Sequence, residues 1–359
     1  MKVSIIGTVG VPANYGGFET LVEQLIKHNA SEDLQYTVYC SRSSYKNQRW
    51  VYHGAKTKYI SLKANGIQSI LYDIVSLVKA ARDSDVILVL GVSGCLFLPF
   101  FRLFSKKRLI INIDGLEHRR DKWNKWVRKF LMFSEAQAVK HGDLIIADNR
   151  GIQQYVSETY HIKSEMIAYG GDHAMLNMPQ PKQNTILQDY NLQNNHYDLA
   201  ICRIEPENNV HLLLEAYSNM PTKKLVVIGN WDKSEYGIKL RKEYTHTNIN
   251  LIDAVYDLNH LYALRNNCRI YLHGHSAGGT NPSLVEAMFF GKPIIAFDCV
   301  YNRETTERQA IYFKTAQDLE DIILNETPSS ECGKMMETIA KNRYTWNKIS
   351  KQYEQLYTF

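Results

Sequence analysis

The feature that most constrains this chain is an alternation of short β-branched runs with amphipathic segments, and it occurs twice. The first series starts with a strand at Val3–Ile6 and extends to a strand at Met166–Ala168. The second starts at Asp198–Cys202 and extends to Pro293–Phe297. Strands that alternate with helices predict parallel sheets covered by helices. At about 150 residues per domain, 359 residues are enough for two such domains.

A polar segment separates the two series. Residues 178–195 contain two prolines and many Asn and Gln residues, and they are the best linker candidate. We therefore predict an α/β protein with two Rossmann-like, doubly wound domains, residues 1–177 and 178–343. We expect the two domains to face each other across a cleft. Ligands of such sheets bind outside the carboxyl ends of the strands, so the site residues should follow strands.

Composition excludes several classes of protein. Apolar residues make up 45% of the chain and charged residues 22%, which is typical of folded globular proteins. A net charge of +5 gives no support for a nucleic-acid partner. The six cysteines are far apart and form no C-x-x-C pair, so a zinc ribbon or a disulfide framework is disfavoured. We expect a cytoplasmic protein without a signal peptide.

One apolar run needs separate consideration. Val86 to Phe101 are 16 uncharged residues, whereas a spanning helix needs about 20. Gly91, Gly94 and Pro99 interrupt the run. We interpret it as a buried strand, a loop and the start of an apolar helix.

The most informative segment is His273–Met288, with the sequence HGHSAGGTNPSLVEAM. A strand ends here, and Gly278 and Gly279 would let a ligand approach the backbone. A helix is predicted to begin next, with Asn281 as its N-cap and Pro282 in its first position.

The start of this helix is the predicted diphosphate site. We expect the amides of Ser283 and Leu284 to be free and to face the loop. Glu286, one turn into the helix, is placed to accept hydrogen bonds from ribose hydroxyls. The alternative interpretation is an ordinary helix–strand unit with a good cap.

Two further segments follow strands. Arg203, in CRIEPENN, is suited to bidentate binding of phosphate, although a structural role is the alternative. Gly16 and Gly17, in NYGGFET, would leave backbone amides accessible at a helix start. This loop is not G-x-G-x-x-G, and no acid follows the strand that ends near Cys40, so a nicotinamide dinucleotide site is disfavoured.

These segments together resemble the family 4 glycosyltransferases of GT-B fold, most closely the bacterial rhamnosyltransferase-like branch. The shared blocks are NYGGFET, DGLEH, RIEPENN and GGTNPSLVEAM, and the resemblance covers nearly the whole chain. It implies transfer of a sugar from a nucleotide-diphosphate donor with retention at the anomeric carbon, without a metal or other cofactor. It also implies a last helix, within residues 344–359, that packs back on the first domain.

The resemblance assigns roles to individual residues. Arg203 would bind the diphosphate as negative charge develops on it, and Glu286 would be the second acid of the family's E-x7-E motif. Gly16 and Gly17 would close over the donor from the first domain. The residues implied to line the donor sugar and phosphate are Gly279, Thr280, Asn281, Pro282, Ser283 and Leu284.

The chain departs from the family pattern at three positions. The first acid of E-x7-E is Gly278, the lysine that follows the arginine is Asn208, and the histidine after the fourth strand is Asp114. A changed sugar pocket suits a donor other than glucose, and the closest branch suggests dTDP-rhamnose. Asp114 or Glu117 would then orient the donor sugar or the acceptor hydroxyl.

Two possible metal motifs have simpler explanations. Asp83-Ser84-Asp85 spells D-x-D, but it precedes a strand, so we interpret it as a solvated turn. His273 and His275 have no third ligand nearby in the sequence, so we predict no metal site.

A cluster of basic residues lies near the start of the helix that follows Asp114. The aromatic residues of this helix follow helical spacing. This spacing fits a helix whose aromatic side packs on the sheet and whose basic side is solvated. The alternative is docking onto an anionic bilayer, and we hypothesise peripheral attachment to the inner face of the plasma membrane. The basic residues are Arg119, Arg120, Lys122, Lys125, Arg128 and Lys129.

The sequence therefore predicts a glycosyltransferase that adds rhamnose to a lipid-linked or growing surface polysaccharide, for example a capsule or an O-antigen. Its partners would be dTDP-rhamnose and a glycolipid or oligosaccharide acceptor. One alternative is a GT-B transferase that uses a UDP-hexose. A second alternative is a non-catalytic subunit that binds sugar nucleotides.

Overall fold

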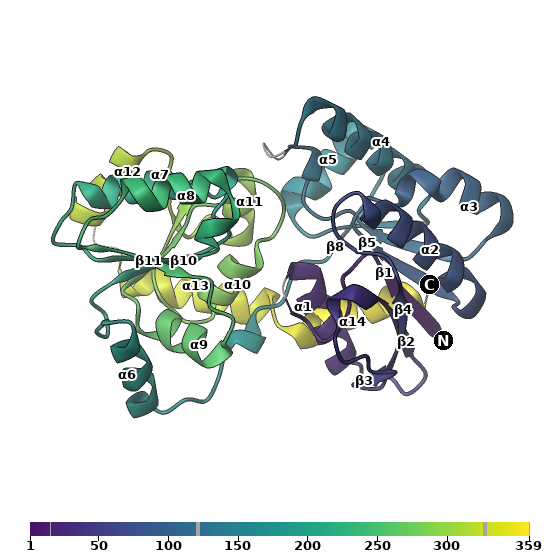
Figure 1. Ribbon diagram of the computed structural model, residues 1–359, viewed down its shortest axis with the longest axis horizontal. Helices are drawn as coiled ribbons and strands as arrows, with labels where there is room; N and C mark the ends of the chain where they lie inside the picture. Colours follow the sequence, from purple (N-terminus) through teal and green to yellow (C-terminus); the bar gives the residue numbers. More distant parts are fainter. Residues whose placement is uncertain (15, 120–122, 326–328, 359) are drawn as a thin grey trace. The chain divides into compact units, whose positions relative to one another are not determined.

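The computed structural model describes residues 1–14, 16–119, 123–325 and 329–358, and the chain divides into two compact units (Figure 1). Unit 1 consists of residues 1–169 and 346–359, and unit 2 of residues 170–345. The sequence prediction placed these boundaries after residues 177 and 343.

Unit 1 is built on an eight-stranded sheet with the order β3-β4-β2-β1-β5-β6-β7-β8. Neighbouring strands are parallel except for β3, which runs antiparallel to β4. All five residues of the central strand β5 are buried, as expected for a strand covered on both faces. The strands are β1 Lys2–Ile6, β2 Gln35–Ser41, β3 Val51–Tyr52, β4 Ala55–Ile60, β5 Val86–Leu90, β6 Arg108–Asn112, β7 Leu144–Ala147 and β8 Glu165–Met166.

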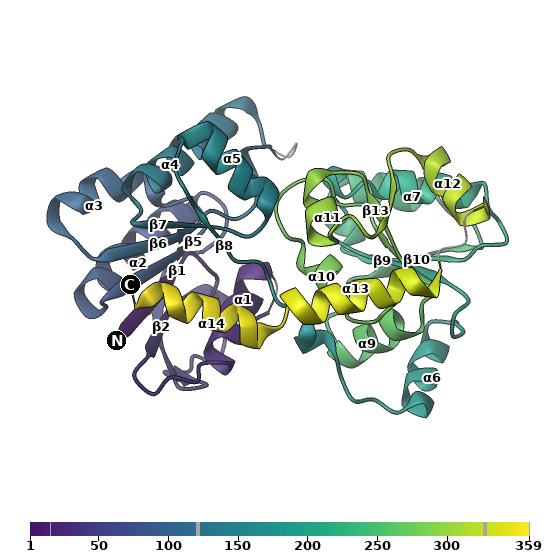
Figure 2. The ribbon, with the colours of Figure 1, turned by 180° about the vertical axis from the view of Figure 1, so that it is seen from behind.

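The helices of unit 1 pack on this sheet through apolar stripes. Leu21, Val22 and Leu25 of α1 are buried, which confirms the stripe predicted from their spacing. Helix α14 lies against α1, and α3 lies against α4 (Figures 1 and 2). The helices are α1 Gly17–Lys27, α2 Gln68–Asp83, α3 Leu98–Phe104, α4 Lys125–His141, α5 Arg150–Tyr160 and α14 Trp346–Tyr357.

Unit 2 has a six-stranded sheet in which every pair of neighbouring strands is parallel. Its order, β11-β10-β9-β12-β13-β14, is that of a Rossmann fold, with the topological switch point between β9 and β12. The strands are β9 Asp198–Ile201, β10 Leu225–Gly229, β11 Ile249–Asp253, β12 Ile270–His273, β13 Ile294–Phe297 and β14 Ile311–Phe313.

Helices cover both faces of this sheet. Figures 1 and 2 show α7, α8 and α12 on one face and α9, α10 and α13 on the other. Leu213, Leu225 and Leu319 belong to one continuous core beneath the first face. The helices are α6 Gln180–Asp189, α7 Val210–Ser218, α8 Glu235–Glu243, α9 Leu258–Asn267, α10 Pro282–Met288, α11 Val300–Thr305, α12 Ala316–Asn325 and α13 Ser330–Arg343.

The predicted linker is wrong, because most of residues 178–195 belong to unit 2 as helix α6 and its connections. Pro181 lies in the first turn of α6, where proline is compatible with a helix because the missing N–H would have no intrahelical partner. Ile186 and Leu187 are buried, and α6 packs against α9. Apolar contacts therefore override a polar composition here.

The apolar run at residues 86–101 folds as predicted, into β5 and the first half of α3. None of the helices in the described part of the chain combines the length and apolar character needed to cross a bilayer.

Candidate active site

Two of the predicted segments lie side by side in unit 2, at the carboxyl ends of β9 and β12. The Ser276 amide donates to the Glu207 carbonyl oxygen at 2.9 Å, and Asn209 Nδ2 donates to the Gly274 carbonyl oxygen at 2.9 Å. A Cβ at Gly274 would lie 2.1 Å from the Asn208 carbonyl oxygen, so only glycine permits this approach. The structure thus brings the arginine segment and the glycine-rich segment together at the edge where Rossmann folds bind ligands.

Asn281 is the N-cap of α10, as predicted, and Pro282 is its first residue. The Asn281 Oδ1 accepts a hydrogen bond from the Ser283 amide at 3.0 Å, and its carbonyl oxygen accepts one from the Leu284 amide at 3.1 Å. The prediction that these two amides are free is therefore wrong. A capping asparagine satisfies the first amides of a helix, so the same residue that starts α10 removes them as ligands.

The backbone conformation explains one departure from the family pattern. Gly278 has φ = 92°, a region that residues with a Cβ rarely adopt. A glutamate at this position would be strained, so the loop is built for glycine. Thr280, two residues later, is 5% exposed.

Glu286 is already engaged in unit 2. Its carboxylate forms an ion pair with the buried Arg265, and its Oε1 lies 3.4 Å from His173 Nε2. Burial opposes ionisation of Glu286, but Arg265 and His173 together hold its pKa below the usual value. A ribose hydroxyl would join an existing network, and the ribose-binding role stays a prediction.

Sequence reasoning missed Arg265 and His173. A signal for Arg265 exists, because it lies three residues after Tyr262 on the buried side of α9. A charged residue on an apolar stripe is almost never buried without a partner. No comparable signal exists for His173, which comes from the short 3₁₀ turn Asp172–Ala174.

Arg203 directly follows the end of β9 and exposes 38% of its side chain. Its guanidinium Nη1 lies 3.8 Å from Glu205 Oε2, and its carbonyl oxygen accepts a hydrogen bond from Asn208 Nδ2 at 2.8 Å. Asn208 Oδ1 lies 2.8 Å from His275 Nδ1. Because the Asn208 amide donates to Arg203, its oxygen must accept from the His275 N–H. Asn208 therefore links Arg203 to His275 where the family pattern has a lysine.

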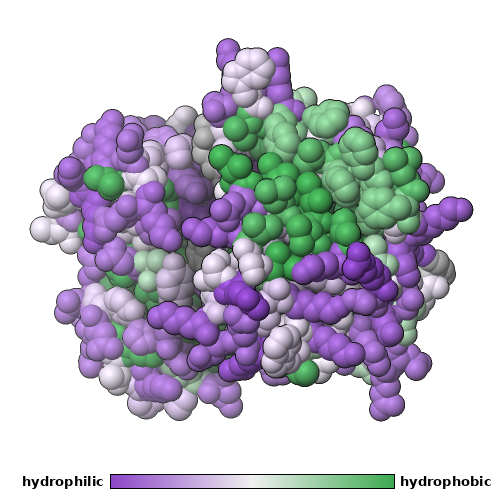
Figure 3. All heavy atoms as spheres, turned by 45° about the vertical axis from the view of Figure 1, so that its right-hand side comes forward, coloured by the Kyte–Doolittle hydropathy of each residue, from purple (hydrophilic) through white to green (hydrophobic). Residues whose placement is uncertain are grey.

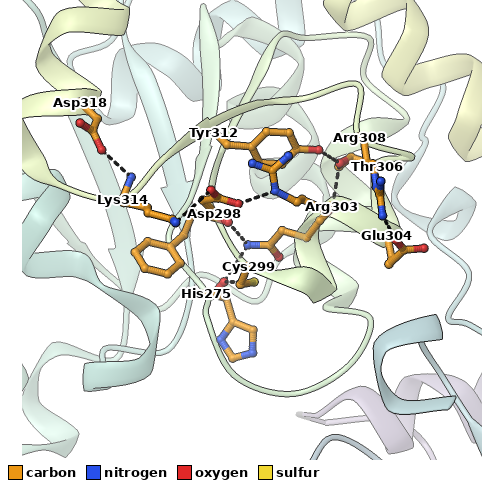
Figure 4. A network of polar contacts seen from close by, with 12 residues as sticks. His275, Asp298, Cys299, Arg303, Glu304, Thr306, Arg308, Tyr312, Lys314 and Asp318 are labelled. Carbon is orange, nitrogen blue, oxygen red and sulfur yellow. Dashed lines mark hydrogen bonds and ion pairs between the residues drawn. The ribbon is translucent and has the colours of Figure 1, made fainter. Parts of the chain in front are cut away.

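A group of polar residues after β13, which includes Asp298 and Asn302, lies near the backbone of His275. The His275 carbonyl oxygen accepts a hydrogen bond from Asn302 Nδ2 at 2.8 Å. Asp298 at the end of β13 binds Arg303 Nε at 2.5 Å and lies 3.6 Å from Lys314 Nζ. Figure 4 shows the His275 ring turned away from the Asp298 network. Asn302 therefore holds the backbone of the glycine-rich segment at His275, while the His275 ring contacts Asn208.

Gly16 and Gly17 are in unit 1, at the start of α1 after strand β1. Gly16 is the N-cap of α1, with φ = 123°. Glu19, in the first turn, accepts hydrogen bonds from Thr8 Oγ1 at 2.9 Å and from the Val9 amide at 2.8 Å. Glu19 thereby holds the loop that precedes the two glycines.

Asp114 and Glu117 also belong to unit 1 and follow β6. Since β1 and β6 both run parallel to β5, this loop is at the same sheet edge as the glycines. Asp114 has φ = 61°, and its amide donates to Asn112 Oδ1 at 3.0 Å. Glu117 Oε2 accepts a hydrogen bond from Trp123 Nε1 at 3.2 Å.

Glu135, which sequence reasoning missed, supports this loop. It is buried and accepts hydrogen bonds from the Tyr155 and Tyr160 hydroxyls at 2.8 and 2.7 Å. Its Oε2 also lies 3.2 Å from Nδ1 of His118, next to Glu117. Glu135 thus fixes the end of the loop that carries Asp114 and Glu117.

The D-x-D sequence lies at the opposite sheet edge. Asp83 is the last residue of α2 and pairs with Lys58, while Asp85 accepts a hydrogen bond from the Lys2 amide at 2.8 Å. Both precede β5. In the described residues there is no group of three or more His, Cys, Asp or Glu side chains that could hold a metal ion.

Comparisons with known proteins divide the chain in a similar way. Residues 1–172 match the family described as Domain of unknown function (DUF1972), and residues 183–325 match Glycosyl transferases group 1. The chain is a glycosyltransferase of the GT-B fold. The group 1 match contains Arg203, Gly278 and Glu286, and the other match contains the candidate residues of unit 1.

Several solved structures share the fold of this glycosyltransferase. Sucrose-phosphate synthase from Thermosynechococcus elongatus has a TM-score of 0.82 at 15% identity, covering 99% of this chain and 98% of that chain. HepE from Anabaena, in complex with UDP and glucose, has a TM-score of 0.77 at 16% identity, covering 99% of both chains. The catalytic domain of starch synthase IV from Arabidopsis thaliana, bound to ADP and acarbose, has a TM-score of 0.74 at 11% identity, covering 99% and 98%. No curated protein sequence matches this chain.

The burial of His273 is expected to make the stability of the glycosyltransferase depend on pH. His273 is 3% exposed, its Nε2 has no hydrogen-bond partner in the described residues, and burial lowers its pKa to about 3. Below about pH 6.5 the unfolded chain protonates this histidine while the folded chain does not. We expect His273 to lower the free energy of unfolding by about 1.4 kcal/mol per pH unit as pH falls from 6.5 toward 3.

Urea unfolding at several pH values tests this expectation. The difference in slope between the wild type and His273→Gln isolates the histidine from the carboxylates that also titrate. Equal slopes for the two proteins would show that His273 is protonated in the folded state.

Proposed function

We propose that this glycosyltransferase transfers rhamnose from dTDP-rhamnose to a lipid-linked or growing surface-polysaccharide acceptor. The reaction retains the anomeric configuration, needs no metal, and takes place at the inner face of the plasma membrane. Unit 2 binds the nucleotide diphosphate through Arg203 and the glycine-rich segment. Asp114 or Glu117 of unit 1 orients the donor sugar or the acceptor hydroxyl.

The observation that carries this proposal is the pairing of two segments at the switch point of unit 2. Arg203 offers a guanidinium there, partly exposed, next to a loop that only glycines can form. A guanidinium binds phosphate oxygens in a bidentate manner, and it stabilises the charge that develops on a departing diphosphate. With the amides of Ser283 and Leu284 occupied, we assign more of this stabilisation to Arg203 than the sequence suggested.

The choice of rhamnose rests on the resemblance and on the departures from the family pattern. Gly278 cannot be replaced by an acid without strain, and Asn208 has structural partners of its own. A sugar pocket without the family's glutamate and histidine suits a sugar with fewer hydroxyls than glucose, whereas the missing lysine leaves the diphosphate with one fewer positive partner. A UDP-hexose donor is the second candidate, favoured by the HepE structure, which contains UDP and glucose.

The donor is identified by thermal unfolding in the presence of dTDP-rhamnose, dTDP, UDP-glucose, UDP-N-acetylglucosamine and UDP. A ligand that binds only the folded chain adds about 2.7 kcal/mol to its stability at a hundred times its dissociation constant. We expect the largest increase in melting temperature with dTDP-rhamnose. Product release measured in EDTA then checks turnover. Turnover with UDP sugars and none with dTDP-rhamnose would reverse the donor assignment.

A further inference from the structure

The outer surface of α3 and α4 carries bulky apolar side chains that the described residues of unit 1 leave exposed. Helix α3 buries Leu98 and Phe101, whereas Phe100, Leu103 and Phe104 are exposed. Figure 3, which brings forward the side of Figure 1 that carries α3, shows hydrophobic side chains gathered over a broad area. The exposed residues are Phe100 (61%), Leu103 (84%) and Phe104 (60%) of α3, and Trp126 (80%), Met132 (49%) and Phe133 (55%) of α4. We name these six residues the apolar face.

The apolar face is unusual because α3 is apolar on nearly all sides. A helix with this pattern is normally surrounded by a protein core or by lipid. Exposed apolar patches rimmed by polar residues mark sites of interaction with proteins or membranes. Phe97 stacks on Phe100, with ring centroids 6.1 Å apart. The exposed ring of Phe100 is therefore supported by a neighbouring aromatic ring.

The charged residues within α3 and α4 are mainly basic. The only acid within α3 and α4 is Glu135, which is buried beneath two tyrosine hydroxyls. Asp143, which follows α4, is paired with Arg102 at 2.7 Å. The side chains of Lys125, Lys129 and Lys106 are exposed. Of the six basic residues in the predicted cluster, Arg120 and Lys122 lie outside the described residues.

A surface cavity of about 460 Å³ adjoins the apolar face at the end of α3. Arg82, Lys106 and Lys107 supply its charge, and Phe104, Val78 and Ala81 supply its apolar wall. This combination suits an anionic headgroup attached to an acyl chain. At the other end of the face, Lys129 Nζ lies 5.6 Å from the centroid of the Trp126 ring. Tryptophan beside lysine is typical of helices that lie at a membrane interface.

We propose that the apolar face of α3 and α4 inserts into the interfacial region of an anionic bilayer, with the surrounding lysines and arginines on the lipid headgroups. The insertion changes the earlier hypothesis, because α3 rather than the basic helix supplies the main apolar contact. The proposal rests on the proposed function for its membrane location and for its biological reason, access to a lipid-linked acceptor. Binding to vesicles needs neither donor nor acceptor, so membrane insertion and the donor assignment can fail separately.

The test is flotation of the full chain with vesicles of phosphatidylcholine, alone or mixed with phosphatidylglycerol. We expect binding to the anionic vesicles that weakens as salt is raised, because headgroup attraction is screened. The triple variant Phe100→Gln/Leu103→Gln/Phe104→Gln should bind at least about tenfold more weakly, since three apolar side chains no longer enter the lipid. Lys106→Gln/Lys125→Gln/Lys129→Gln should lose the preference for anionic vesicles.

Matched controls come from unit 2. Leu324→Gln and Ile238→Gln remove exposed apolar side chains, and Lys239→Gln/Lys341→Gln removes exposed charges; these variants should bind as the wild type does. Circular dichroism and the melting temperature without ligand check that each variant is folded. Brominated lipids should quench the tryptophan fluorescence of the wild type more strongly than that of Trp126→Phe.

Three results would overturn the proposal. The first is no vesicle binding by the wild type, and the second is equal binding by the wild type and the α3 triple variant. The third is a dimer of the wild type in light scattering that becomes a monomer in the triple variant, without vesicle binding by either protein. A second copy of the chain would then be the occupant of the apolar face.

Discussion

Replacing Arg203 by alanine is expected to lower kcat about 10²–10³-fold while leaving the fold intact. The side chain is 38% exposed, and its ion pair with Glu205 is 3.8 Å long, so solvent screens this pair. Its loss therefore removes little from the stability of unit 2. The leaving diphosphate, however, would lose a guanidinium in the transition state. The measurement is release of nucleoside diphosphate at saturating donor, with donor affinity from thermal shifts.

Two variants serve as controls for this result. Arg203→Lys keeps the charge but loses the planar fork, so we expect an intermediate rate. Arg308→Ala removes an arginine that exposes 72% of its side chain and precedes β14 at the opposite sheet edge, and the rate should not change. Full turnover by Arg203→Ala would contradict our assignment of the diphosphate site.

The second large effect concerns stability. Arg269→Met is expected to lower the free energy of unfolding by about 3–5 kcal/mol. Asp198, the first residue of β9, is 1% exposed and binds the Arg269 guanidinium through both carboxylate oxygens. Burial raises the pKa of Asp198 even though Arg269 opposes it. Without Arg269 the chain must bury a carboxylate that has lost its counter-ion, although the Tyr217 hydroxyl still donates to it, and this burial is costly.

The pH dependence separates this cause from simple loss of packing. A carboxyl whose pKa is raised by folding weakens the folded state as pH rises through that pKa. The loss in Arg269→Met should therefore be largest near neutral pH and should shrink as pH is lowered. Urea unfolding at several pH values measures it, and the double variant Asp198→Asn/Arg269→Met should recover part of the stability.

A matched control for the stability prediction is Arg241→Met. Arg241 pairs with Asp232 and Asp253, whose side chains are 76% and 70% exposed. Pairs of this kind contribute about 0–1 kcal/mol. An equal loss in Arg241→Met and Arg269→Met would show that burial of Asp198 is not the cause.

Much of the fold could be predicted because its signals are local. The apolar stripe of α1 and the five buried residues of β5 are visible as spacing and as an uninterrupted run. Asn281 was predictable as a cap for the same reason. A capping asparagine accepts hydrogen bonds from the first amides of its helix, here those of Ser283 and Leu284. The sequence therefore already argued against the prediction that these two amides are free.

Other features depended on residues that are distant in the sequence. The burial of α6 depends on its contact with α9, and composition gave no sign of it. The partners of Glu286 come from α9 and from the turn at residues 172–174. Glu135 reaches His118 and two tyrosines of α5 only because α4 and α5 pack together around the loop after β6.

The amino-acid sequence by itself determined the two doubly wound sheets and the segments that follow their strands, since hydrophobic periodicity and glycine placement act over a few residues. Only the tertiary structure decided which charges are paired, which amides are occupied and which apolar side chains remain exposed. Leu103 of α3 illustrates the difference. Its apolar neighbours in the sequence suggest a buried residue, but the packing of α3, which includes its contact with α4, buries Leu98 and Phe101 and leaves Leu103 exposed. A short helix can bury only one side, and the rest of the fold selects which one.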